Sequence, residues 1–178
     1  MPDGYELVND TDGRNNPQME LDSLSDRQLL DLHCTVMDAL RLRGVVRSSN
    51  NPLADYAETI VARALAAQLA ASSQSGYDAV GQDGTRYQIK ARRLTVPNGS
   101  TQLSAIRNLA AAPFDRLAAV VFDGRLAIQY AALIPIDVVA ALARYSTHTN
   151  SHTLHFRRTV LKEPGVVDIT SLVKAAAN

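Results

Sequence analysis

GYDAVGQDGTRYQIK, residues 76–90, is the stretch that decides the fold. Apolar and polar residues alternate on both sides of its Asp83-Gly84 pair, with the period of a β-strand that has one buried face. Asp-Gly between two such runs is a strong signal for a hairpin turn. We therefore predict two antiparallel strands, over residues 77–82 and 85–92.

The second strand places two polar side chains on one face, because Gln88 and Lys90 are two residues apart. Whether Asp78 shares that face depends on the length of the hairpin loop. A two-residue loop leaves Asp78 on the opposite face, whereas a three-residue loop, residues 82–84 with Gly84 left-handed, pairs Asp78 with Gln88. A lysine directed toward the packed side of a strand is costly unless a negative group lies nearby. We therefore expect the three-residue loop, with Asp78 and Lys90 side by side.

Upstream of the hairpin, Asn51 followed by Pro52 predicts the start of a helix that runs to about Leu69, since Asn caps helices and Pro suits the first helical position. Five apolar residues should face the core: Ala57, Ile60, Val61, Ala64 and Leu65. Glu58 lies in the same row as Val61, three residues later on the same face. A carboxylate in an apolar row faces either a cleft or the edge of the core, and both alternatives stay open here.

Helices and strands continue on both sides of this region. Ser25 and Gln28 form a capping-box sequence that starts a first helix, with Gly44 as its expected stop. Its apolar face comprises Leu29, Leu32, Val36, Met37 and Leu40. Downstream we predict a helix over 101–109, strands over 117–122 and 126–133, a helix over 135–144, a strand over 152–157 and a closing helix over 168–176. The pattern predicts one α/β domain over residues 23–178, a mixed central sheet flanked by helices, with a two-helix N-terminal lead-in.

Three parts of this pattern together resemble the PD-(D/E)XK nuclease superfamily, whose core is restriction-endonuclease-like. They are Glu58 on a helix, Gly76-Tyr77-Asp78-Ala79 on one strand and Tyr87-Gln88-Ile89-Lys90 on the next. The order of helix, hairpin, helix and further strands is also similar, over roughly residues 51–133. Three shorter pieces look like a small bacterial family of unassigned function: NPL with DYAE at 51–58, RYQIK at 86–90 and QLSAIR at 102–107.

The resemblance implies a role for each residue of the cluster. Asp78 would be the principal metal ligand, and Glu58 an auxiliary carboxylate that binds the metal directly or through water. Lys90 would orient the attacking water or stabilise the charge growing on the phosphate. Gln88 stands where the superfamily usually has an acid, although branches such as methylation-directed restriction enzymes carry glutamine there. The implied activity is Mg²⁺-dependent or Mn²⁺-dependent hydrolysis of phosphodiester bonds in DNA.

The glutamine has a physical consequence and leaves a rival function open. The Gln88 carbonyl can ligate a hard cation but brings no charge, so Glu58 and Asp78 supply the only carboxylates. Metal binding should therefore be weak, and without metal we expect Lys90 to form a salt link with both carboxylates. The rival is a catalytically weak or inactive module of the same fold that binds DNA or a protein partner.

Charge is distributed unevenly along the chain. Of 18 acidic and 18 basic residues, seven acids and one base lie in residues 1–26, so the rest of the chain is basic. A basic body suits a nucleic acid, whereas the polar, acidic segment 1–22 is expected to be a disordered arm. Candidate phosphate contacts are Arg92, Arg93, Gln102 and Arg107. Because cutting two strands takes two sites, a homodimer is an expected partner arrangement.

Several classes of protein are excluded by the composition. The chain lacks an apolar run of ~18 residues, so we expect no membrane span, and its start does not resemble a secretory signal. Cys34, the single cysteine, excludes an internal disulfide and suits a reducing compartment, so we expect a cytoplasmic protein. We expect Cys34 to be buried. The histidines at 148, 152 and 155 fit a loop entering a strand better than a zinc site.

Overall fold

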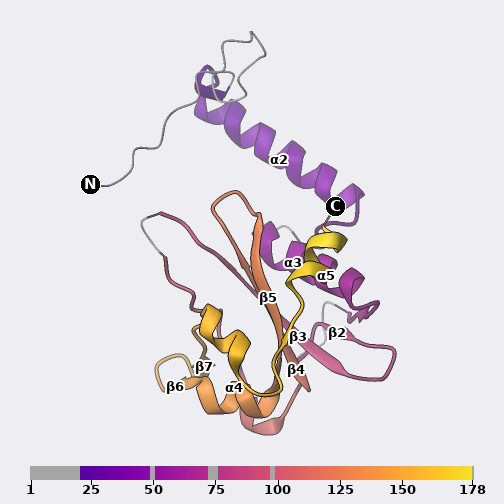
Figure 1. The fold of residues 1–178 in the computed structure, drawn as a ribbon. Coiled ribbons are helices and arrows are strands. Elements are labelled where there is room, and N and C mark those ends of the chain that lie inside the picture. Colours follow the sequence, from indigo (N-terminus) through magenta and orange to yellow (C-terminus); the bar gives the residue numbers. More distant parts are fainter. Residues whose placement is uncertain (1–20, 49–50, 72–75, 97–98, 178) are drawn as a thin grey trace, which may run out of the picture.

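The computed structural model describes residues 21–48, 51–71, 76–96 and 99–177, and these residues form an α/β fold (Figure 1). Its α-helices are α2 (Asp26–Leu42), α3 (Pro52–Ala64), α4 (Ile136–Leu142) and α5 (Thr170–Ala176), with short 3-10 helices at Leu109–Ala111 and Arg158–Lys162. Among the described residues, no helix has the length and apolar character to cross a membrane. All but two residues of the predicted acidic arm lie outside the described ranges.

The central sheet is mixed and has six strands in the order β1-β2-β3-β4-β5-β8. They are β1 (Gln68–Leu69), β2 (Ala79–Val80), β3 (Arg86–Arg93), β4 (Arg116–Phe122), β5 (Ile128–Pro135) and β8 (Val167–Asp168). Only the β3–β4 pair is parallel, and the other neighbours are antiparallel. β6 (Arg144–Ser146) and β7 (Ser151–Thr153) form a separate antiparallel hairpin. The predicted mixed sheet is therefore confirmed.

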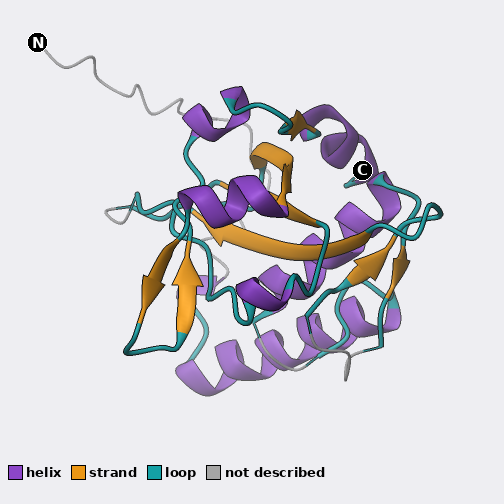
Figure 2. Ribbon diagram, turned by 90° about the horizontal axis from the view of Figure 1, so that it is seen from below, coloured by secondary structure: helices purple, strands orange, loops and turns teal. Residues whose placement is uncertain are grey.

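Hydrophobic cores lie on both faces of the sheet. α3 and α5 cover the first face, where Ile60 and Val173 are fully buried. α4 and the irregular segments around residues 101–109 and 154–160 cover the second face. The two views at right angles show helices on both sides of the strands (Figures 1 and 2). Since Tyr87 and Ile89 of β3 belong to the first core, the alternate residues of this strand point to the second side.

The hairpin between β2 and β3 has the three-residue loop that the site requires. Ala79 pairs with Tyr87 in the ladder, and the N–H of Gly81 donates to the carbonyl of Thr85 over 2.8 Å. Gly84 has a φ of +82°, in the left-handed region that favours glycine. The predicted register is therefore confirmed, and it follows from glycine at the one loop position where the backbone needs a positive φ.

The helix predicted over residues 101–109 is wrong. This segment is extended, with isolated bridges from Gln102 to His155 and from Ile106 to His152. Leu103 and Ile106 are buried and spaced as on a helix, but their backbone groups bond to the carbonyls of Leu154 and His152. Tertiary pairing thus replaces the local hydrogen bonds of a helix, and the connection between the parallel strands β3 and β4 is a long loop.

The predicted start and stop of α2 are confirmed, and most of its apolar face is exposed. Ser25 and Gln28 form the capping box, and Gly44 follows the helix with a φ of +66°. Met37 is the one buried residue of this helix, whereas Leu32 remains 40% exposed. Cys34 is also exposed, against the prediction. Figure 1 shows the reason, since α2 stands away from the sheet over most of its length.

Candidate functional site

Asp78 lies at the point where β2 separates from β3. The ladder between these strands ends at Ala79, although the N–H of Asp78 still donates to the carbonyl of Tyr87 over 2.8 Å. The next N–H on the open side of β3, that of Ile89, donates instead to the Asp78 carboxylate over 2.6 Å. The Asp78 side chain therefore takes the place of a strand partner and is fixed against the edge of β3.

Glu58 approaches Asp78 from α3. Its neighbours Ala57 and Ile60 are fully buried, and the Glu58 side chain itself is only 16% exposed. Burial raises the pKa of the Glu58 carboxyl above its ordinary value, and the negative charge of Asp78 raises it further. The sequence left open whether Glu58 faced a cleft or the edge of the core, and the structure places it beside a second carboxylate.

Lys90 is partly buried and lies within electrostatic range of both acids. Burial lowers the pKa of its ammonium group, whereas the charges of Asp78 and Glu58 act in the opposite direction. The salt link that we expected from Lys90 to these carboxylates is absent, since the described part of the chain places no carboxylate within ion-pair distance of it. The reason is a different cation, because the guanidinium of Arg47 already pairs with Glu58.

Gln88 lies two residues before Lys90 and therefore on the same face of β3. Its Oε1 atom is buried and has no hydrogen-bond partner in the described structure. A buried acceptor without a donor costs free energy, on the order of 1–3 kcal/mol. Such an atom therefore indicates a missing partner, and a cation is one partner that an amide oxygen can take.

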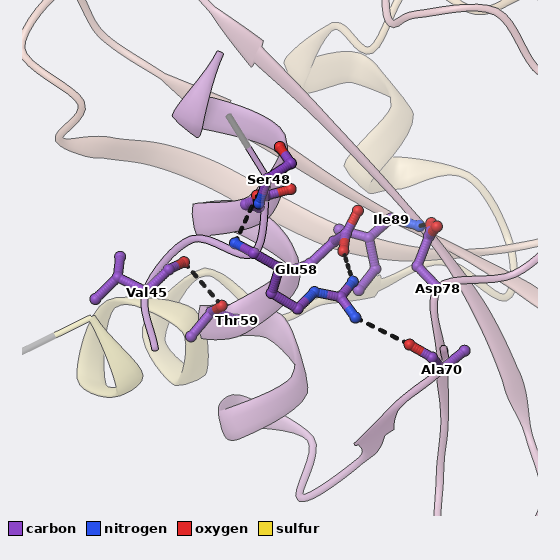
Figure 3. A network of polar contacts seen from close by, with 9 residues as sticks. Val45, Ser48, Glu58, Thr59, Ala70, Asp78 and Ile89 are labelled. Atoms are coloured by element: carbon purple, nitrogen blue, oxygen red, sulfur yellow. Dashed lines mark hydrogen bonds and ion pairs between the residues drawn. The ribbon is translucent and has the colours of Figure 1, made fainter. Parts of the chain in front are cut away.

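Arg47 is the main residue of this site that the sequence did not reveal. Its guanidinium pairs with Glu58 and also donates to the carbonyl of Ala70 over 2.9 Å (Figure 3). The backbone N–H groups of Arg47 and Ser48 both donate to the Asp55 carboxylate over 2.7 Å. Figure 3 shows these contacts between the segment after α2, the side of α3 and the end of β1. The segment thus holds a fixed positive charge against Glu58.

The four predicted phosphate contacts are separated by the structure. Arg92 donates to the carbonyl of Ser100 over 2.8 Å, and Arg93 donates to the carbonyl of Gly124. Both guanidinium groups therefore hold loops. Arg107 is exposed, and its charge contributes to the lowered pKa of Lys90, so it lies near the cluster. Gln102 is exposed and forms an isolated bridge with His155, two residues after β7.

The donor set fits a hard divalent cation. Mg²⁺ prefers oxygen ligands with a few carboxylates, and Glu58, Asp78 and the free Oε1 of Gln88 offer three oxygens from three elements. Within the described ranges, no group of three or more His, Cys, Asp or Glu residues could hold a metal ion. The fit therefore depends on the amide oxygen of Gln88 as the third donor. It also depends on release of Glu58 from Arg47, which competes for the same carboxylate.

Neither the protein-family models nor the curated proteins contain a match to this chain. What the site does is therefore a question for its own geometry.

Proposed function

We propose that this chain is a Mg²⁺-dependent phosphodiester hydrolase that acts on DNA, with a restriction-endonuclease-like core of the PD-(D/E)XK type. The observation that carries the proposal is the buried, unpartnered Oε1 of Gln88 on the strand face that Lys90 shares. The charges of Glu58 and Asp78 act on each other and on the pKa of the same lysine, although neither carboxylate forms an ion pair with it. If the cluster served only to hold the Arg47–Glu58 ion pair, the unpartnered Oε1 of Gln88 would have no role.

Part of the order of elements around the site supports the same core, whereas the helix expected after the hairpin is replaced by an extended segment. A helix with an inward acid, α3, precedes the antiparallel hairpin β2–β3, and β4 then pairs in parallel with β3. The buried strand β4 pairs with β3 from Tyr87 to Arg93, and on the other side of β3 the Asp78 carboxylate accepts the N–H of Ile89. This arrangement fixes the backbone beneath Gln88 and Lys90, and a metal-assisted site requires such positional precision.

Each residue of the cluster has a part in the proposed reaction. When bound, Mg²⁺ supplies a Lewis acid that polarises a phosphoryl oxygen and lowers the pKa of a coordinated water. Asp78, held by the N–H of Ile89, and Glu58 provide the negative charge that retains the cation. Lys90 in its charged form stabilises the negative charge that develops on the phosphate. Arg107, close to Lys90 and exposed, adds a second positive charge for the phosphodiester backbone.

A second candidate function is a catalytically weak module that binds DNA or a protein partner. The specific observation in its favour is the Arg47–Glu58 ion pair, which neutralises one of the two carboxylates. With Gln88 in place of an acid, the cluster then keeps a single uncompensated acid, Asp78. A homodimer, in which two clusters would face two DNA strands, belongs to the hydrolase proposal and not to this one.

Cleavage of labelled duplex DNA separates the two functions. The wild type, Lys90→Ala and the control Lys174→Ala, an exposed lysine on α5, are compared with Mg²⁺, with Mn²⁺ and with EDTA. We expect metal-dependent cleavage that falls by roughly a hundredfold or more in Lys90→Ala, because a charge aimed at the transition state is lost. The control should keep full activity. DNA binding without cleavage under all conditions would favour the binding module, and equal cleavage by wild type and Lys90→Ala would refute the proposed site.

A further inference from the structure

A polar cavity borders the second core of the protein, and none of the residues of the carboxylate cluster line it. It has a volume of about 340 Å³ and lies between the end of α4, the β6–β7 hairpin and the 3-10 helix at Arg158–Lys162. Figure 2 shows the two strands of this hairpin beside the central sheet and not within it. The polar residues of the cavity wall are Arg144, Thr153, His155, Arg157, Thr159 and Glu163.

Four of these residues lie along one part of the cavity wall. Leu154 and Phe156 are 1% and 0% exposed and point into the second core. Thr153, His155 and Arg157, which alternate along the chain with these two buried residues, all line the cavity. Arg144 pairs with Thr153 in the β6–β7 register, and paired residues of an antiparallel ladder share a face. Backbone pairing thus positions Arg144 and Thr153 in the cavity wall, and Arg157 joins them from the residue before the 3-10 helix.

The charges of this wall are not balanced. Arg144 and Arg157 are exposed, and within the described ranges neither guanidinium forms a hydrogen bond or an ion pair. Glu163 is the one acid among the described residues that line the cavity, and it is not within ion-pair distance of either arginine. In contrast, Arg92 and Arg93 are occupied by backbone carbonyls. The two cavity arginines therefore keep their donors available for a ligand.

We propose that this cavity binds phosphate groups. Arginine presents a planar fork of donors that matches two phosphate oxygens at once, and two such forks, from β6 and from the start of the 3-10 helix, can hold one phosphate from two directions. The hydroxyl groups of Thr153 and Thr159 are further donors to the same anion. The volume lies at the lower end of the range for small-molecule sites and admits a phosphate with an attached sugar. The phosphate can come from a nucleic-acid backbone or from a free nucleotide.

Binding at this cavity does not depend on the proposed hydrolysis. None of Glu58, Asp78, Gln88 and Lys90 lines it. The segment 101–107, however, runs from the cavity side toward the cluster, since Gln102 pairs with His155 and Arg107 acts on Lys90. A DNA strand that is held in the cavity can therefore continue along the outer side of this segment, where Gln102 and Arg107 are exposed. The binding experiment is carried out in EDTA, so that a failure of the hydrolase proposal cannot affect its result.

The test measures binding of labelled single-stranded DNA by fluorescence anisotropy as a function of salt. The cavity variant is Arg144→Gln/Arg157→Gln, and the control is Arg63→Gln/Arg125→Gln, which removes the same charge from exposed positions elsewhere. We expect the cavity variant to bind about tenfold more weakly at low salt. Its slope of log affinity against log salt should fall by about 1.4, since each lost phosphate contact contributes ~0.7 on single-stranded DNA. The control should stay within about twofold of the wild type.

Competition experiments identify the source of the phosphate, and additional variants separate loss of binding from loss of folding. Displacement of DNA by pyrophosphate or a nucleoside triphosphate would indicate a site for single phosphate groups, whereas displacement only by unlabelled DNA would indicate a backbone site. Thr159→Glu keeps both arginines but adds an acid to the wall, so it should also weaken binding. Arg157→Lys keeps the positive charge at this position, so it should bind more tightly than the cavity variant. Equal losses in the cavity and control variants, or no binding of DNA or pyrophosphate by the wild type, would overturn the proposal.

Discussion

The carboxylate of Asp78 accepts a hydrogen bond from the backbone N–H of Ile89 over 2.6 Å, at the place where β2 no longer pairs with β3. One side chain thereby has two tasks. It completes the hydrogen bonding of a central strand, and it holds a negative charge beside Lys90. Substitutions of Asp78 must therefore be judged on stability as well as on activity.

Asp78→Ala should destabilise the protein by about 1–3 kcal/mol, because the N–H of Ile89 loses its acceptor in a partly buried place. Asp78→Asn keeps an acceptor at this position and should cost less. Urea unfolding of both variants measures the difference. If both variants are as stable as the wild type, the contact with Ile89 does not contribute to the stability of the fold. In the hydrolase proposal both should lose metal binding, because only the carboxylate carries the charge.

Gln88→Glu should increase the affinity for Mg²⁺, because it replaces the buried neutral acceptor with a carboxylate beside Glu58 and Asp78. Without metal, the same change adds a third acid to a buried cluster, so the melting temperature should fall. Calorimetric titration and thermal melts with and without Mg²⁺ measure the two effects. Gln82→Glu, in the exposed hairpin loop, is the control. Weaker metal binding by Gln88→Glu would place Gln88 outside the coordination sphere.

Arg47→Gln should also increase metal affinity, by a different route. The substitution releases Glu58 from its ion pair, while the N–H contacts of the segment to Asp55 remain. The pKa of Glu58 should rise further in the metal-free protein, since Arg47 is the charge that now lowers it. Titration with Mg²⁺, with Arg43→Gln as the control from the exposed end of α2, tests this expectation. An unchanged affinity would show that Arg47 does not compete with the cation.

The difference in burial between α2 and α3 should appear as a difference in the free energy of unfolding between variants of the two helices. Ile60 on α3 is fully buried, and Ile60→Ala should cost about 2–5 kcal/mol because it leaves a cavity in the first core. Leu32 on α2 is 40% exposed, so Leu32→Ala should cost less than about 1 kcal/mol. Denaturant unfolding of the two variants provides the comparison. A large loss for Leu32→Ala would mean that the apolar face of α2 is covered.

Local chemistry accounts for the parts of the fold that the sequence predicts well. The three-residue loop follows from glycine at position 84, and the start of α2 follows from the Ser25–Gln28 capping box. Both depend on residues that are close in the chain. The segment 101–109 could not be predicted in the same way, because the spacing of its apolar residues suits a helix. Its extended form depends on pairing with His152 and His155.

The candidate site shows the same division. Strand alternation places Gln88 beside Lys90, and helix periodicity places Glu58 in an apolar row, so these residues follow from periodicity alone. Arg47 does not, because its partners Glu58 and Ala70 lie 11 and 23 residues away in the chain. The one signal in the sequence is its position shortly before a helix with an inward acid, which makes this arginine a candidate partner for that acid. Apart from its position, no local pattern distinguishes Arg47 from the exposed arginines.

Acid stability provides the last test, at the pair formed by Arg86 and Asp115. Arg86 donates to Asp115 through its guanidinium over 2.8 Å and through its backbone N–H over 2.8 Å, which ties the start of β3 to the start of β4. The side-chain hydrogen bond from Arg86 lowers the pKa of the Asp115 carboxyl, and the backbone N–H adds to this effect. A lowered pKa in the folded state means that the stabilisation is complete above the unfolded pKa of about 3.9. It is lost as the pH falls through the lower folded value.

Both side chains are more than one third exposed, so solvent limits the contribution to about 1 kcal/mol or less. Asp115→Asn should therefore be less stable than the wild type at neutral pH, and the difference should vanish in acid. Urea unfolding from neutral pH to below pH 3 measures it, and a difference that stays constant with pH would rule out the charge of Asp115 as its cause.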